Sequence, residues 1–66
     1  MNLRNFEKMD PNLLIGLVNT ALRNDYDNLD DLAKTQDIDS STLEEKLAQI
    51  GYVYQPEQNQ FRPQPK

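Results

Sequence analysis

Apolar residues recur at helical spacing early in the chain. Positions at i, i+3, i+4, i+7 and i+8 place five of them on one helical face: Leu14, Leu17, Val18, Ala21 and Leu22. Asp10 and Pro11 precede them and are typical of a helix start, because aspartate accepts a hydrogen bond from a free backbone N–H and proline has none to satisfy. We therefore expect a first helix from residue 11 to residue 23 or 25.

Two shorter apolar patterns predict a second and a third helix. The second covers residues 29–36 after Asn28 as its cap, with an apolar face at Leu29, Leu32 and Ala33. The third covers residues 40–50 after Asp39 or Ser40 as its cap, with an apolar stripe at Leu43, Leu47 and Ile50. Ile38, in the turn between them, is expected to point inward. Gly51 suits the left-handed backbone that ends helices.

Aromatic and β-branched residues near the end of the sequence predict a β-hairpin. Residues 52–54 form its first strand and residues 60–62 its return strand. Between them, Pro56 fixes the first turn position, and Asn59 tolerates the left-handed backbone that lets the chain return. In this register Tyr54 lies opposite Phe61, which predicts an aromatic cross-strand pair.

The order of these elements predicts a mainly α fold with a minor β part. It is a three-helix, helix-turn-helix-like domain over residues 10–62 with a C-terminal β-hairpin, which follows where a wing would lie. A generic three-helix packing with a flap is the alternative. We expect residues 1–9 to form a flexible arm, although Leu3, Phe6 and Met9 also suit a frayed helical turn. Residues 63–66 are expected to form a disordered tail.

The absence of cysteine and histidine restricts the chemistry open to this chain of 66 residues. Without cysteine there is no disulfide and no thiolate metal site, and without histidine the commonest metal ligand and general base are missing. The acids Asp25, Asp27 and Asp31 lack the spacing of a calcium-binding loop and its closing glutamate. We therefore expect one small domain that is not an enzyme and has no cofactor and no metal site.

The longest apolar run is too short to span a membrane. It covers residues 13–18 and contains Gly16, whereas a helix needs roughly 20 apolar residues to cross a bilayer. No small-residue cleavage site follows it, so it does not resemble a signal peptide. We expect a cytoplasmic protein with no membrane partner.

Negative charge is concentrated in the middle of the chain. The net charge is −4, and residues 25–45 contain eight acids against Lys34 alone. The eight are Asp25, Asp27, Asp30, Asp31, Asp37, Asp39, Glu44 and Glu45. Such a stretch repels phosphate, and binding to DNA by counterion release needs several basic contacts.

The third helix nevertheless offers polar positions for a partner. We expect its exposed residues to be Ser40, Ser41, Thr42, Glu45, Lys46 and Gln49. Ser41, Thr42 and Gln49 suit contacts with bases, but Lys46 does not outweigh the neighbouring glutamates, and the hairpin adds only Arg62. The candidate partner-binding residues are Asp30, Asp31, Ser41, Thr42, Glu45, Lys46 and Gln49.

Several short stretches carry a resemblance to a known family. They are residues 9–14 (MDPNLL), 18–19 (VN), 22–23 (LR), 29–32 (LDDL), 38–39 (ID), 43–47 (LEEKL), 51–54 (GYVY) and 57–61 (EQNQF). With them the chain resembles a bacterial family of short proteins catalogued only as a domain of unknown function, number forty-two fifty. That family has no assigned activity, so the resemblance implies no catalytic or binding residues. Residues 32–54 resemble winged helix-turn-helix regulators more loosely.

Three functional hypotheses follow from this combination of shape and charge. The leading one is a small non-enzymatic protein-interaction or regulatory module whose partner is a protein. The alternative is a weak or partner-assisted DNA-binding winged helix-turn-helix domain that uses the third helix and the hairpin. In the third, the acidic surface mimics DNA and occupies the groove of a basic protein. A homodimer is favoured if Ile15 or Tyr26 is exposed.

Overall fold

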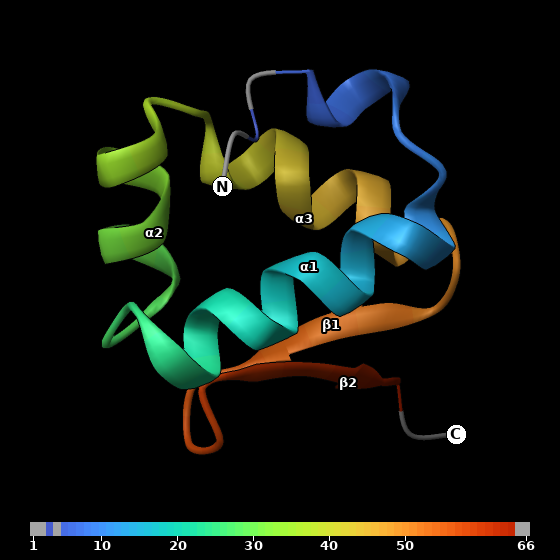
Figure 1. Ribbon diagram of the computed structural model, residues 1–66. Coiled ribbons are helices and arrows are strands. Elements are labelled where there is room, and N and C mark those ends of the chain that lie inside the picture. The colour runs from blue at the N-terminus through green and yellow to red at the C-terminus, as the bar shows by residue number, and fades with distance from the viewer. Residues whose placement is uncertain (1–2, 4, 65–66) are drawn as a thin grey trace.

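The computed structural model describes residue 3 and residues 5–64 of the chain. Three α-helices are followed by a two-stranded antiparallel hairpin, so the fold is mainly α with a minor β part, as the sequence predicts (Figure 1). In chain order the elements are the 3-10 helix η1 (Phe6–Lys8), the helices α1 (Pro11–Asn24), α2 (Leu29–Gln36) and α3 (Ser40–Ala48), and the strands β1 (Tyr52–Gln55) and β2 (Gln60–Pro63).

A side-chain cap begins each of the three α-helices. The carboxylate or amide oxygens of Asp10, Asn28 and Asp39 each accept a hydrogen bond from a backbone N–H in the first turn, at 3.0, 2.8 and 3.1 Å. These bonds satisfy donors that have no partner inside a helix. The sequence left Asp39 and Ser40 as alternative caps of the third helix, and the structure uses Asp39.

Helix α3 ends at Ala48, two residues before the predicted end. The backbone N–H groups of Gln49, Ile50 and Gly51 each bond to the carbonyl three residues earlier, at 3.3, 3.2 and 3.0 Å. This tighter i to i+3 pattern closes the last turn, and the chain then leaves through Gly51 with a φ of +81°. The predicted left-handed glycine is therefore confirmed.

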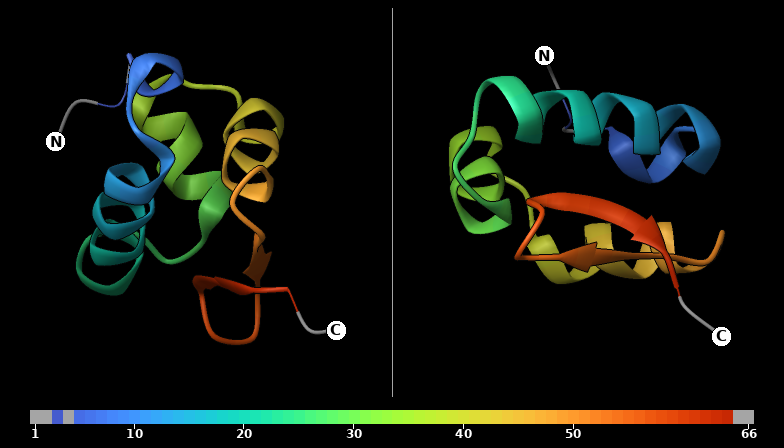
Figure 2. Two further views of the ribbon diagram at one scale, coloured as in Figure 1. Left: turned by 90° about the vertical axis from the view of Figure 1, so that its right-hand side faces the viewer. Right: turned by 90° about the horizontal axis from the view of Figure 1, so that it is seen from below.

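The hairpin lies beneath α1 and α3 and packs against both helices (Figure 1). Strand β1 packs against α3, and strand β2 packs against α1. Figure 2 shows this from below, with α3 behind β1 and α1 on the side of β2. Helix α2 lies at one end of the molecule, between the end of α1 and the start of α3 (Figure 1).

One hydrophobic core joins all of these layers. Its most buried members from the three helices and the hairpin are Leu14, Val18, Ala21, Leu22, Leu29, Leu32, Leu43, Leu47 and Phe61. Two predicted core positions differ. Leu17 and Ile50 are half-buried. Leu13 in the first helix is 59% exposed. The apolar residues of this helix therefore extend around more of its surface than the face that packs into the core.

The core begins before the first α-helix. Leu3 is fully buried and Phe6 is 3% exposed, and both belong to the core cluster. The domain predicted to start at residue 10 therefore includes apolar side chains of the preceding segment, and the 3-10 turn η1 corresponds to the turn that this spacing also allowed. The flexibility expected of residues 1–9 stays a prediction, and Met1, Asn2 and Arg4 lie outside the described residues.

The hairpin has the predicted register. Tyr54 pairs with Phe61, with ring centroids 5.5 Å apart, and Asn59 takes the left-handed backbone at a φ of +52°. Strand β2 continues through Pro63, and the N–H of Gln64 donates to the carbonyl of Gly51 at 2.7 Å. The tail expected from residue 63 is therefore paired at its first two positions, and residues 65–66 lie outside the described part of the chain.

Candidate binding site between helix α3 and the hairpin

Each strand of the hairpin has an outer edge, and the residues whose backbone N–H and C=O groups point away from the other strand lie along it. Antiparallel strands alternate between pairs that exchange backbone hydrogen bonds and pairs that do not. Gly51 and Gln64 are bonded through the N–H of Gln64, whereas the backbone of Phe61 bonds away from β1, to Asn19. Counting alternately from the bonded pair Gly51–Gln64, two pairs do not exchange backbone hydrogen bonds. They are Tyr52 with Pro63 and Tyr54 with Phe61.

The outer edge of β2 is closed by a side chain of α1. The amide of Asn19 accepts a hydrogen bond from the Phe61 N–H at 2.7 Å and donates one to the Phe61 carbonyl at 3.0 Å. This amide thus makes the two contacts that a third strand would make. Gln60 adds a bond from its Nε2 to the backbone carbonyl of Asn19 at 2.9 Å. The β2 edge is consequently occupied at its centre.

The outer edge of β1 is open. The sheet has only the two strands β1 and β2, so no strand within residues 3 and 5–64 lies on the other side of β1. Because Tyr52 and Tyr54 are non-bonded pairs with β2, their backbone N–H and C=O groups point to this free side. An exposed strand edge of this kind is a template for pairing with another chain.

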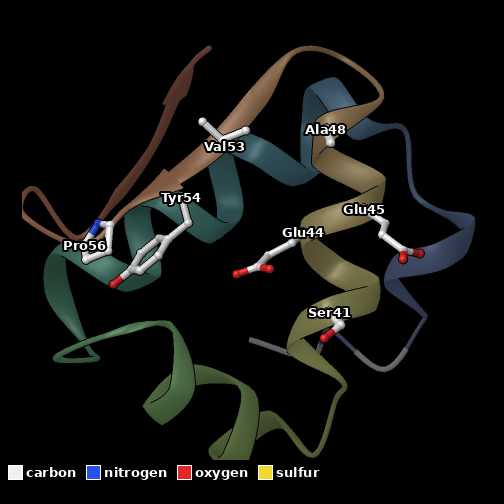
Figure 3. Close-up of a pocket in the computed structure, with 7 residues that line it drawn as sticks. All are labelled: Ser41, Glu44, Glu45, Ala48, Val53, Tyr54 and Pro56. Atoms are coloured by element: carbon white, nitrogen blue, oxygen red, sulfur yellow. The ribbon is translucent and has the colours of Figure 1, made fainter. Parts of the chain in front are cut away.

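A groove of about 530 Å³ borders this open edge. Its helical wall is one stripe of α3, formed by Ser41, Glu44, Glu45 and Ala48, which lies on a different face of the helix from the buried Leu43 and Leu47. Its other wall is Val53, Tyr54 and Pro56 at the end of β1. Figure 3 shows these side chains on both walls, with the Glu44 carboxylate between α3 and Tyr54. We call it the α3–β1 groove.

A second hollow of about 290 Å³ continues the α3–β1 groove toward α2. Glu44, Tyr54 and Pro56 line both, and the second hollow adds Asp30 at the start of α2. The charged residues lining the pair are Asp30, Glu44 and Glu45, all exposed acids. The nearest cation in α2, Lys34, lies 3.0 Å from the Asp30 carboxylate in an exposed ion pair. Because Lys34 offsets the charge of Asp30, the negative charge of the combined surface comes mainly from Glu44 and Glu45.

The strand wall of the α3–β1 groove is held in place by hydrogen bonds of the Tyr54 hydroxyl. This oxygen accepts a hydrogen bond from the Leu29 N–H at 3.2 Å and donates to Asn59 Oδ1 at 2.7 Å. Asn59 in turn donates through Nδ2 to the carbonyls of Leu22 and Tyr26, at 2.9 and 3.0 Å. The end of α1, the start of α2 and the hairpin loop are thus joined at one point, which positions β1 against α3.

The predicted partner-binding residues lie on different surfaces. Ser41 and Glu45 line the α3–β1 groove, and Asp30 lines the hollow beside it. On the other flank of α3 a polar hollow of about 240 Å³ is lined by Glu7, Thr42, Glu45, Lys46 and Gln49. Asp31 lines none of these hollows, and its carboxylate accepts a weak hydrogen bond from the Asp27 N–H at 3.4 Å. The structure therefore brings together only part of the set.

Several polar groups expected on the free surface of α3 are already engaged. The Thr42 hydroxyl donates to the Asp39 carboxylate at 3.0 Å, and the Lys46 ammonium donates to the Glu7 carbonyl at 2.9 Å. Thr42, Lys46 and Ser40 are half-buried, so the prediction that they are exposed is wrong. The segment before α1 causes this for Lys46, because η1 packs against α3.

The strand side of the groove is not predicted by the sequence. The sequence predicts Val53, Tyr54 and Pro56 as parts of the hairpin and not of a binding surface, and its candidate partner-binding residues include neither Glu44 nor Ala48. The spacing of Ser41, Glu44, Glu45 and Ala48 at i, i+3, i+4 and i+7 was a usable signal, since it is one helical face. No local signal in the sequence indicates which strand edge remains open.

The groups that line the α3–β1 groove are suited to contact with a ligand. Among the described residues, no group of three or more histidine, cysteine or acidic side chains is placed to hold a metal ion. Within the same part of the chain, each helix is too short or too polar to cross a membrane. The groove offers backbone hydrogen-bonding groups, carboxylates and a tyrosine ring, which are groups that recognise a ligand.

The comparison with known proteins identifies a family. No curated protein and no solved structure matches the chain. One family profile matches residues 8–61, which contain α1, α2, α3, β1 and the start of β2, and so both walls of the groove. The matched part is well over half of the 66 residues. The chain therefore belongs to the family described as Domain of unknown function (DUF4250).

Proposed function

We propose that this chain is a small non-enzymatic protein-interaction or regulatory module that binds its partner through the α3–β1 groove. The observation that carries the proposal is the open edge of β1 beside a stripe of α3 that bears Glu44 and Glu45. Protein partners use such edges for main-chain pairing and such carboxylates for charge recognition. The groove is also built on two secondary-structure elements, which position its groups more firmly than a loop.

The competing function is DNA binding by α3 and the hairpin as a winged helix-turn-helix. The order of α2, a short turn and α3 is its support. The surface argues against it, because Glu44 and Glu45 lie on the outer face of α3 and would oppose phosphate. Lys46 is bound to the Glu7 carbonyl, and Lys34 is paired with Asp30. Several free cations on one face are required for affinity by counterion release.

Site-directed photo-crosslinking tests the proposal. A photoreactive amino acid replaces Ala48 in the wall of the groove, and in a matched control it replaces Thr20, which is exposed on α1. We expect one stoichiometric protein to crosslink from position 48 and not from position 20. Equal crosslinking from both positions, or none from position 48, would contradict the proposal.

A titration with labelled duplex DNA tests the competing function. Fluorescence anisotropy is followed from low to physiological salt, with wild-type protein and with Lys46→Glu and Arg62→Glu. We expect flat anisotropy for all three. Binding in the roughly micromolar range that weakens steeply with salt, and that either substitution abolishes, would favour the DNA-binding function instead.

A further inference from the structure

The geometry points to the occupant of the α3–β1 groove: an extended segment of a partner protein that carries lysine or arginine at alternate positions. The segment adds as a third strand to the open edge of β1 and places its cations against the carboxylates of α3. This inference rests on the proposed function and names the partner class that the groove recognises.

The backbone of β1 supplies the pairing groups. Tyr52 and Tyr54 point their N–H and C=O groups away from β2, so an incoming strand meets two donors and two acceptors on this edge. Extended peptides bind other proteins by this addition of a strand, in which main-chain hydrogen bonds give affinity and alternate side chains give specificity. The β2 edge is not equivalent, because the side-chain amide of Asn19 already bonds to the backbone N–H and C=O of Phe61.

The groove between α3 and β1 provides the space for that strand. Its wall of the groove is made of Ser41, Glu44, Glu45 and Ala48, and Ala48 is the small side chain nearest the start of β1. A third strand lies about 4.8 Å from β1. The groove of about 530 Å³ lies on this side of β1, and the second hollow extends it along the same direction toward Asp30.

Charge selects the partner. Glu44 and Glu45 lie on the helical wall and Asp30 lies at the far end, and the chain as a whole has a net charge of −4. Side chains alternate between the two faces of a strand, so cations at every second position share one face. A segment with alternate cations therefore matches the acids on one side and leaves its other residues free.

A second copy of this chain fits the groove poorly. The strand that a second copy would add to this edge is its own β1, Tyr52–Gln55, which contains no cation, and each copy has a net charge of −4. Negative charge on both copies therefore disfavours this pairing. The homodimer considered from the sequence therefore finds no support at this edge, and Ile15 and Tyr26, the other residues considered for it, are both half-buried and packed against the core.

The test is a nuclear magnetic resonance titration of the ¹⁵N-labelled full chain with a short peptide of alternating lysine and valine. We expect saturable shifts at Tyr52 and Tyr54, and at least about tenfold slower hydrogen exchange of these two amides, since each gains a bond. The Val53 amide, which already faces β2, serves as the internal control. A peptide of alternating glutamate and valine is expected not to bind.

Two modified peptides test the pairing itself. One carries N-methyl groups at its lysines and the other at its valines. Because alternate N–H groups point to opposite sides of a strand, we expect one of the two to lose binding at least tenfold and the other to keep it. Equal binding by both, or loss by both, would show that main-chain pairing is not the mode.

Protein variants test the role of charge. Glu44→Lys and Glu45→Lys are each expected to weaken binding of the lysine peptide at least fivefold. Asp25→Lys, the same change at an exposed acid outside both hollows, is expected to leave it within twofold. Absence of peptide binding, or equal effects of the three variants, overturns the inference. Crosslinking of a protein from position 48 would still stand in that case, so the two failures are distinguishable.

Discussion

The side-chain amide of Asn19 on α1 bonds to both backbone groups of Phe61 on β2. The Phe61 N–H donates to Oδ1 at 2.7 Å, and its carbonyl accepts from Nδ2 at 3.0 Å. The two residues are 42 positions apart in sequence. This pair fastens the hairpin to the first helix and closes the outer edge of β2, so within the described residues the open edge of the sheet is that of β1.

Replacement of Asn19 by alanine should destabilise the fold. It removes two hydrogen bonds and leaves the Phe61 backbone groups unpaired in a partly buried place, which costs about 2–3 kcal/mol of unfolding free energy. Urea denaturation followed by circular dichroism measures the loss. Asn24→Ala, at the exposed end of α1, is the control, with an expected change within about 0.5 kcal/mol. Similar losses in the two variants would contradict the pairing.

The segment before α1 should contribute to stability. Leu3 is fully buried, and a Leu→Ala change at such a site costs about 2–5 kcal/mol. Leu13→Ala deletes the same atoms from a side chain that is 59% exposed and should cost far less. Differential scanning calorimetry is the measurement, with an expected fall in Tm of at least about 10 °C for Leu3→Ala. A flexible arm without a role in the core would give equal melting temperatures.

Asn59 should be sensitive to substitution for two separable reasons. It adopts a φ of +52°, and its side chain donates to the Leu22 and Tyr26 carbonyls. Asn59→Gly keeps the backbone conformation accessible and loses only the side-chain bonds, whereas Asn59→Ala loses both and should be about 1 kcal/mol less stable than the glycine variant. Equilibrium unfolding in urea ranks the two. Greater stability of the alanine variant would be the contradicting result.

Asn59→Asp isolates the donor role of the same side chain. A carboxylate can accept the Tyr54 hydroxyl proton but cannot donate to the two carbonyls of the α1 end. We expect a loss of at least about 2 kcal/mol that becomes smaller at acidic pH, where the neutral acid regains one donor. A pH series of urea denaturation curves measures this, and a loss that does not depend on pH would argue against it.

The Tyr54 hydroxyl should stabilise the fold independently of its ring. Tyr54→Phe keeps the aromatic pair with Phe61 but removes the bonds to the Leu29 N–H and to Asn59. The expected cost is about 1–2 kcal/mol. Tyr52 is a half-buried tyrosine of the same strand, and no hydrogen bond of its hydroxyl is found among the described residues, so Tyr52→Phe is the matched control and should change stability by less than about 0.5 kcal/mol. Thermal melts followed by circular dichroism at 222 nm compare the two variants. An equal loss of stability in both would contradict a specific contribution of the Tyr54 hydroxyl.

Local signals explain why the helices were predicted well. Asp10, Asn28 and Asp39 cap their helices through bonds that span only two or three residues, and the apolar spacing of each helix acts within the same short range. The end of α3 was the exception. Ile50 continues the apolar period, but the chain tightens into a 3-10 turn before Gly51, and periodicity alone does not distinguish the two geometries.

The candidate site was predictable only on its helical side. The stripe of Ser41, Glu44, Glu45 and Ala48 follows from helical spacing, and the acidic character follows from composition. The engagement of Lys46 by the Glu7 carbonyl was not visible, because it depends on η1 lying against α3. A loose arm over residues 1–9, as the sequence predicts, would make neither this contact nor the buried contacts of Leu3 and Phe6.

The sequence by itself determined the elements, their caps, the hairpin register and the negative charge of α3, because each depends on residues that are neighbours along the chain or opposite each other across a short loop. The tertiary structure decided which polar side chains join distant segments. Asn19 reaches Phe61 and Asn59 reaches Leu22 across 42 and 37 positions. Such contacts arise only when packing of the core brings these segments together, and they leave β1 as the strand with a free edge.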